Sequence, residues 1–148
     1  MRRIAFADLP SLAGEEIGVT DWTLVDQPMI DAFAEATGDR QWIHVDVERA
    51  KREMGGTIAH GFLTLSLMAT LSYEMLEIEG VRSGLNYGFD RVRFTCPVAS
   101  GSRVRLRQRC ESVEPIAGGF QMKSACTMEI EGSERPALVA EWIGRMYG

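Results

Sequence analysis

The chain contains only two histidines, and both lie in one region that also carries acidic side chains. His44 and His60 are 16 positions apart, and Asp39 and Asp46 lie close to His44. Because an imidazole with an ordinary pKa near ~6.5 can give or take a proton at neutral pH, a carboxylate and a histidine that converge on one water predict acid–base chemistry. The alternative is that His44 is a packed or hydrogen-bonded structural histidine and that Asp39 only caps the preceding turn. The spacing alone leaves both interpretations open.

Glycines surround the second histidine, in the segment GGTIAHG at residues 55–61. If a helix begins at Gly61, its free backbone N–H groups and the positive end of its dipole can face a developing oxyanion. The alternative is a tight turn with ordinary glycines at a helix start. A phosphate-binding P-loop is excluded, because no Gly-Lys-Ser/Thr follows.

Metal binding is a third interpretation of the same side chains. Two imidazoles and two carboxylates, from Asp39, His44, Asp46 and His60, are a reasonable ligand set. However, neither histidine is placed one helical turn from another of these ligands. We therefore predict that this region binds no metal.

Local signals predict the elements that must position these residues. Residues 17–26 are rich in β-branched and aromatic side chains and predict a first strand. Asp26 suits a helix N-cap and Gly38 a helix end, so residues 27–37 are expected to form an amphipathic helix. Residues 39–60 predict a long structured loop with at most a short helical piece in VERAKRE.

A second helix is expected from Gly61 to about Ile78, where the sequence is apolar around the whole circumference. Such a helix must be wrapped by other elements, and the C-terminal half supplies them, since apolar and polar residues alternate there at period two. The alternating stretches are residues 85–95, 104–112, 120–130 and 137–147. This order predicts an α+β, hot-dog-like domain in which a curled antiparallel sheet of about five strands wraps one apolar helix.

The composition is that of one globular domain, which we place at residues 1–148. A formal charge of −5 argues against nonspecific nucleic-acid binding. No stretch reaches the ~20 apolar residues of a membrane span. The N-terminal segment lacks a secretory pattern, because its short apolar part is interrupted by Asp8 and Pro10. A cytoplasmic location without a membrane or nucleic-acid partner is expected.

The three cysteines are widely spaced and show no metal-like pairing. Cys96, Cys110 and Cys126 all fall among strand-like alternations. We expect buried, reduced thiols, which agrees with a cytoplasmic location.

Two segments of the chain resemble a known family. ATGDRQWIHVD at residues 36–46 and GGTIAHGFLTLSL at residues 55–67 are similar to the hydratase-2 motif of MaoC-like dehydratases, and the match resembles the NodN-like subgroup most. The resemblance continues through GVTDWTLVDQ at residues 18–27 and GLNYGFDRVRFTCPVASGSRVR at residues 84–105, so it covers most of the chain. It implies a hot-dog fold.

The resemblance also implies roles for particular residues. In this family an aspartate and the histidine five positions later form the catalytic dyad, which places Asp39 and His44 in these roles. The glycine at the helix start donates a backbone N–H to the thioester oxygen, and its counterpart is Gly61. The loop between the two histidines looks about one residue shorter than the family pattern. The motif residues themselves are intact.

Four further residues are candidates for lining or supporting the site. His60 precedes the helix-start glycine, and Asn86 and Tyr87 lie in a segment that resembles the family's NYG. Some relatives use a hydroxyl further along the central helix to position the dyad. Ser66 is one candidate for this supporting role, but Ala69 occupies the next inward-facing place.

The implied reaction is the reversible syn hydration of a trans-2-enoyl thioester to an (R)-3-hydroxyacyl thioester, carried on coenzyme A. It requires no metal or redox cofactor. The family assembles as homodimers, which would also cover the exposed edge strand of a single hot-dog sheet. Cationic residues that are candidates for phosphate contacts, or for the solvated face of a strand, are Lys51, Arg52, Arg91, Arg93, Arg103 and Arg105.

Two other function classes remain open. A hot-dog thioesterase would hydrolyse the same kind of acyl thioester with a carboxylate alone, and it would not need the spacing from Asp39 to His44. A noncatalytic acyl-binding or assembly protein would need neither group. The apolar residues of the central helix could line an acyl tunnel or form plain core.

Overall fold

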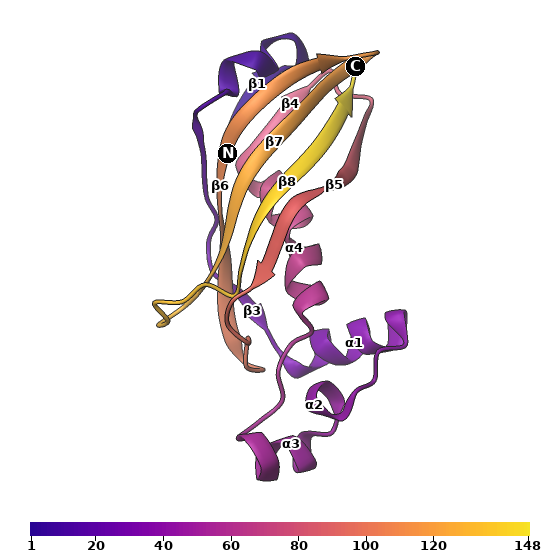
Figure 1. Ribbon diagram of the computed structural model, residues 1–148, viewed down its shortest axis with the longest axis vertical. Helices are drawn as coiled ribbons and strands as arrows, with labels where there is room; N and C mark the ends of the chain where they lie inside the picture. The colour runs from indigo at the N-terminus through magenta and orange to yellow at the C-terminus, as the bar shows by residue number, and fades with distance from the viewer.

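A strongly curled antiparallel sheet wraps one long helix in the computed structural model, which describes residues 1–148 (Figure 1). The strand order is β2-β6-β7-β8-β5, and β3 also pairs with β6. The strands of this sheet are β2 (Glu16–Val19), β3 (Thr23–Val25), β5 (Ser83–Phe94), β6 (Ser102–Ile116), β7 (Gly119–Ile130) and β8 (Leu138–Tyr147). The predicted α+β, hot-dog-like arrangement is confirmed, and all four alternating stretches form strands.

The wrapped helix is α4 (Gly61–Met75), and it forms the centre of the hydrophobic core. Leu63, Met68, Leu71 and Met75 are buried against the inner face of the sheet. The curvature of the sheet explains why apolar residues occur around so much of this helix, since more than one side of it meets strands. None of the helices has both the length and the apolar character needed to cross a membrane.

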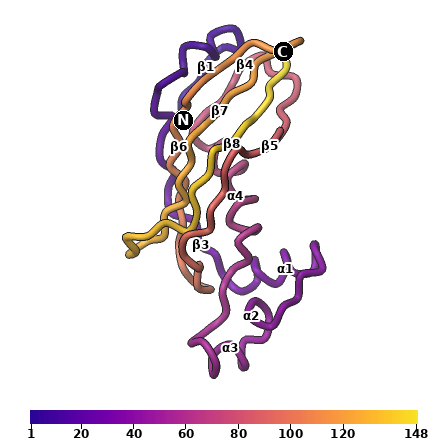
Figure 2. Tube along the Cα trace, viewed as in Figure 1, coloured from indigo at the N-terminus to yellow at the C-terminus, as the bar shows by residue number.

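Three shorter helices cluster beside the N-terminal end of α4, beyond the end of the sheet (Figures 1 and 2). They are α1 (Gln27–Thr37), α2 (Trp42–Val45) and α3 (Val47–Met54). The Asp26 side chain accepts a hydrogen bond from the Met29 N–H at 3.1 Å, and Gly38 ends α1 in the left-handed conformation at φ 80°. Both predicted ends of α1 are thus confirmed. The predicted long loop contains two helices rather than one short piece.

The structure departs from the sequence predictions in two places, in the strand region before α1 and at the C-terminal end of α4. The single strand predicted at residues 17–26 is two short strands, β2 and β3, which pair with different parts of β6. The central helix ends at Met75 instead of Ile78, because the backbone turns extended at Leu76. The next residues form β4 (Leu76–Glu79), which pairs in parallel with an unpredicted first strand, β1 (Arg2–Ala5). A 3₁₀ helix, η1 (Phe6–Leu12), follows β1.

Candidate active site

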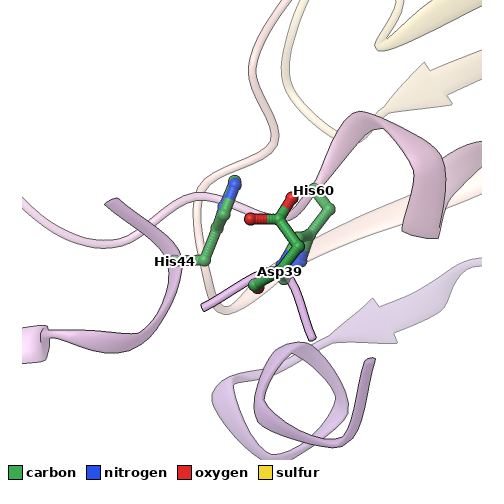
Figure 3. A group of neighbouring side chains, drawn as sticks. All are labelled: Asp39, His44 and His60. Carbon is green, nitrogen blue, oxygen red and sulfur yellow. The ribbon is translucent and has the colours of Figure 1, made fainter. Parts of the chain in front are cut away.

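Three of the predicted site residues come together where the segments around α1, α2 and α4 meet. Asp39, His44 and His60 lie side by side in Figure 3, and one potential ligand atom from each lies within 4.8 Å of the others. His44 and His60 are only 6% and 3% exposed, whereas Asp39 is exposed. The cluster therefore joins two buried imidazoles to a carboxylate that solvent can reach.

His44 is held so that one ring nitrogen remains free. It lies in α2, and its Nδ1 is 2.7 Å from the Ile58 carbonyl oxygen. A carbonyl can only accept, so Nδ1 carries the proton and Nε2 keeps its lone pair. The backbone oxygen of His44 accepts a hydrogen bond from the Gln27 side chain at 2.8 Å. Both ends of the residue are thus fixed, and Nε2 is available as a base.

Asp39 follows the glycine that ends α1. Its backbone N–H donates to Thr37 Oγ1 at 3.3 Å, and its carboxylate accepts only a long hydrogen bond of 3.4 Å from the Gln41 N–H. The carboxylate forms no ion pair with any lysine or arginine. Its oxygens therefore remain available to orient a water molecule.

Gly61 begins α4 as predicted, and its backbone N–H donates to no other group of the protein. A free N–H at the positive end of a 15-residue helix is suited to an oxyanion. A Cβ at this position would lie 2.9 Å from Cδ1 of Phe94. Only glycine allows this close approach of the aromatic ring to the helix start.

A cavity of about 240 Å³ lies beside these groups. Its lining includes His44, Gly61, Thr64, Phe94 and Cys96. The candidate base and the candidate oxyanion donor thus face one space. Asp39 and His60 do not line the cavity. They lie next to His44, which does line it.

Sequence reasoning missed several residues that support this arrangement. Gln27 accepts a hydrogen bond from the buried Thr57 hydroxyl and donates one to the His44 carbonyl. These two bonds connect α1 to α2 and to the segment that precedes α4. The Thr64 hydroxyl donates to the Gly61 carbonyl at 2.7 Å. Gln27, Thr64 and Cys96 all lie inside segments that resemble the family, and this is the only signal for them. The local pattern places Thr64 in a helix and Cys96 at a strand end.

The other candidate residues lie away from this cavity in the single chain. The Ser66 hydroxyl is exposed and donates to the Phe62 carbonyl at 2.7 Å. Asn86 lines a different hollow near the C-terminal end of α4, and Tyr87 is exposed with the Arg145 guanidinium 3.4 Å from its ring centroid. Their predicted roles in binding or support remain predictions.

The geometry of the two imidazoles weighs against the metal interpretation. The rings of His44 and His60 are stacked, with centroids 3.8 Å apart and an angle of 21° between their planes. An imidazole lone pair lies in the plane of its ring, so two nearly parallel stacked rings cannot both aim at one ion. The Asp46 side chain accepts a hydrogen bond from the Arg49 N–H at 3.0 Å, which caps α3.

The candidate phosphate-binding cations divide into two groups. Arg103 pairs with Glu131 at 2.5 Å, and Arg105 pairs with Glu129 at 2.6 Å, so both are engaged on the outer face of the sheet. The four without an ion pair are Lys51, Arg52, Arg91 and Arg93. Of the predicted set, only these four can meet a phosphate without first breaking an ion pair.

Comparison with known proteins agrees with the geometry. A family model described as "MaoC like domain" matches residues 8–130. The chain belongs to this family. It is 48% identical over 141 residues to 3-hydroxyacyl-thioester dehydratase Z of Mycobacterium tuberculosis H37Rv, covering 94% of this chain and 93% of that protein. It is also 49% identical over 148 residues to Nodulation protein N of Rhizobium leguminosarum bv. viciae. That match covers 97% of this chain and 91% of the nodulation protein.

Solved structures share the fold of this MaoC-like protein. The unliganded R-hydratase PhaJ1 from Pseudomonas aeruginosa superposes with a TM-score of 0.73 at 20% identity, covering 91% of this chain and 81% of that chain. At this identity the match concerns the fold. The predicted family, the NodN-like resemblance and the hot-dog fold are thereby confirmed.

Proposed function

We propose that this MaoC-like protein is an (R)-specific enoyl-CoA hydratase, or 3-hydroxyacyl-CoA dehydratase in the reverse direction. The observation that carries the proposal is that His44, whose Nε2 has no protein partner, and Gly61, whose N–H is free, line one cavity while the Asp39 carboxylate lies beside the histidine. The relatives named as a dehydratase and an R-hydratase support the same reaction class.

The reaction follows from these three groups. Asp39 and His44 hold one water, and the dyad takes a proton from it as its oxygen adds to Cβ of the trans-2-enoyl thioester. The thioester oxygen gains enolate charge, which the Gly61 N–H stabilises, an interaction typically worth about 3 kcal/mol. The dyad then returns a proton to Cα on the same face. The water is thus added as OH on Cβ and H on Cα, and no redox equivalent or metal is required.

The test is one reaction in which the enoyl group, the free thiol, the product configuration and any bound ligand are measured. Purified protein is given crotonyl-CoA, and the loss of enoyl absorbance is followed together with the release of free thiol. We expect loss of the enoyl band without thiol, and chiral chromatography of the product should give the (R)-3-hydroxy isomer. Thiol release would instead identify a thioesterase, and no change with bound ligand would identify an acyl-thioester-binding protein.

Coenzyme A is the expected carrier, and its phosphates need cationic partners. Lys51 and Arg52 lie on α3, next to the helix that carries His44, and Arg91 and Arg93 lie near the end of β5 that reaches Phe94. All four are free of ion pairs. They are therefore better placed than Arg103 or Arg105, which carboxylates already neutralise.

A homodimer is the second part of the proposal. β5 is the last strand of the sheet, so its outer backbone groups have no partner strand. Large apolar side chains are exposed on β5 and on the adjacent face of α4. They include Phe62, Tyr73, Leu85, Tyr87 and Phe94. A second copy paired along β5 would cover this surface, and we place the assembled enzyme in the cytoplasm.

A further inference from the structure

His60 is the most completely enclosed polar residue near the site. Its ring lies between the Phe33 ring, with centroids 4.8 Å apart, and the His44 ring, with centroids 3.8 Å apart. Only 3% of the residue is exposed, and it does not line the cavity. His60 therefore cannot contact the substrate from its present position, yet it touches the candidate base directly.

The hydrogen bonds of His60 determine its tautomer. Nε2 lies 2.9 Å from the backbone carbonyl oxygen of Asp39, so it carries the proton and donates. Nδ1 is buried and has no hydrogen-bond partner. The protein offers Nδ1 no donor, so the bond from Nε2 to Asp39 is the only side-chain hydrogen bond that His60 makes within the protein.

The backbone of His60 connects the same residue to the oxyanion donor. Its carbonyl accepts from the N–H groups of Leu63 at 3.0 Å and Thr64 at 3.3 Å, which fixes the first turn of α4. The following peptide N–H is that of Gly61. One residue thus fixes the helix start through its backbone, the Asp39 segment through Nε2, and the His44 ring through stacking.

We propose that His60 is a positioning residue that sets the placement of Asp39 and His44 relative to the Gly61 N–H. The inference rests on the proposed hydratase function but goes beyond it, since it assigns His60 no contact with the substrate. Its decisive interaction is the hydrogen bond to the Asp39 carbonyl. Asp39 itself makes only two other hydrogen bonds, at 3.3 and 3.4 Å, and the ion pair next to it joins Arg40 to Glu35, not Asp39 to the site.

Two substitutions separate positioning from simple filling of space. His60→Phe keeps an aromatic ring between Phe33 and His44 but cannot donate to Asp39. We expect its kcat for crotonyl-CoA hydration to fall about 100-fold, with KM little changed, because a displacement of ~1 Å in the reacting groups can cost that much. His60→Gln carries an N–H near the position of Nε2 and should retain most of the wild-type kcat. A folded His60→Phe variant with wild-type kcat would overturn the proposal.

A second measurement does not depend on activity. Because the chain has only two histidines, the His44→Gln variant contains His60 alone, and its ring nitrogens can be assigned directly by ¹⁵N NMR. The neutral Nε2–H tautomer is expected. The Nδ1–H tautomer would exclude donation to Asp39 and overturn the proposal, even if His60→Phe fails to fold. If wild-type protein hydrates no enoyl thioester, the proposed function fails, and the NMR result still decides whether His60 donates to Asp39.

Discussion

The two histidines of the site bond to backbone carbonyls through different ring nitrogens, His44 through Nδ1 and His60 through Nε2. The Ile58 carbonyl accepts a hydrogen bond from His44 Nδ1–H, which leaves Nε2 unprotonated as the proposed base. The Asp39 carbonyl accepts a hydrogen bond from His60 Nε2–H, so this ring nitrogen is a donor. At the scale of single residues, the choice of tautomer therefore distinguishes the proposed base, His44, from the proposed positioning residue, His60.

The dyad can be tested directly. Asp39→Asn and His44→Gln should each lower hydratase turnover by about 100-fold or more, because each removes the group that orients or deprotonates the water. Circular dichroism should show a retained fold for Asp39→Asn, since Asp39 is exposed. Asp46→Asn is the matched control from the same loop. Asparagine caps helices as well as aspartate does, so this variant should keep wild-type turnover, and equal losses in all three would refute the dyad.

The oxyanion assignment predicts a separate effect at Gly61. In Gly61→Ala the new methyl group would lie 2.9 Å from Cδ1 of Phe94, so the ring or the helix start must move. We expect a clear fall in kcat with a small change in melting temperature, because Phe94 is 47% exposed and its ring can shift. Stopped assays with crotonyl-CoA and calorimetry measure the two quantities. Unchanged kcat would show that another group holds the thioester oxygen.

The cysteines should differ in reactivity. Burial raises the pKa of Cys110 to about 11 and that of Cys126 to about 12, so both remain protonated at pH 8. Cys96 is only partly buried and lines the cavity. Since the thiolate is the reactive form, iodoacetamide should label Cys96 alone in the native protein. Peptide mass spectrometry provides the measurement, and labelling of Cys126 at a similar rate would contradict the buried geometry.

At the scale of elements, the sequence predicts those helices and strands whose limits depend on local sequence signals. α1 has the predicted limits, because Asp26 and Gly38 are strong start and end signals. The strands of the C-terminal half alternate clearly, so the sequence predicts them. For residues 76–78 the sequence predicts the end of the central helix, because Leu76 and Ile78 continue the helical pattern and only pairing with β1 makes them extended.

The same holds for the site. Residues that belong to a local motif could be predicted, whereas contacts that depend on the tertiary fold could not. Asp39, His44 and Gly61 could be named from motif spacing and family resemblance. The bond from His60 to the Asp39 carbonyl joins residues 21 positions apart, and its geometry depends on how the loop folds over α4. No spacing rule predicts it. The paired state of Arg103 and Arg105 likewise depends on the register between β6 and β7.

The pairing of β6 with β7 carries a pH-dependent contribution to stability. Burial raises the pKa of Glu129, but hydrogen bonds and charge from Arg105 and Arg107 outweigh this effect and leave the pKa below its usual value. A carboxyl with a depressed folded-state pKa stabilises the fold above its unfolded pKa of about 4.3, and the contribution is lost as pH falls through the folded value.

Glu129→Gln should therefore lower the free energy of unfolding by about 1 kcal/mol at pH 7, since Glu129 bonds to two arginines and is only 25% exposed. Urea titrations of wild type and variant at several pH values measure the difference. It should shrink below about pH 4. A difference that stays constant down to the lowest pH would assign the loss to packing instead of charge.

At the scale of the whole molecule, the two edges of the sheet differ in the length of their strands. On one side β2 and β3 both pair with β6, and neither is longer than four residues. On the other side β5 runs for 12 residues with an unpaired edge and exposed aromatic side chains. The last residue of β5, Phe94, packs against Gly61 at the cavity. Pairing along β5 would therefore stabilise one wall of the active site as well as cover an association-prone edge.

The two edges allow a matched test of the dimer. Leu85 on β5 and Leu24 on β3 are both leucines of similar exposure, 56% and 48%. Leu85→Asp would bury a carboxylate in the proposed interface, and this cost should disrupt the dimer. Light scattering at micromolar concentration should give about twice the 16.4 kDa protomer for wild type and Leu24→Asp, and one protomer for Leu85→Asp. Because β5 would lose its partner strand, Leu85→Asp should also show reduced hydratase turnover. A wild-type mass of one protomer, or dissociation by Leu24→Asp alone, would show that β5 is not the contact.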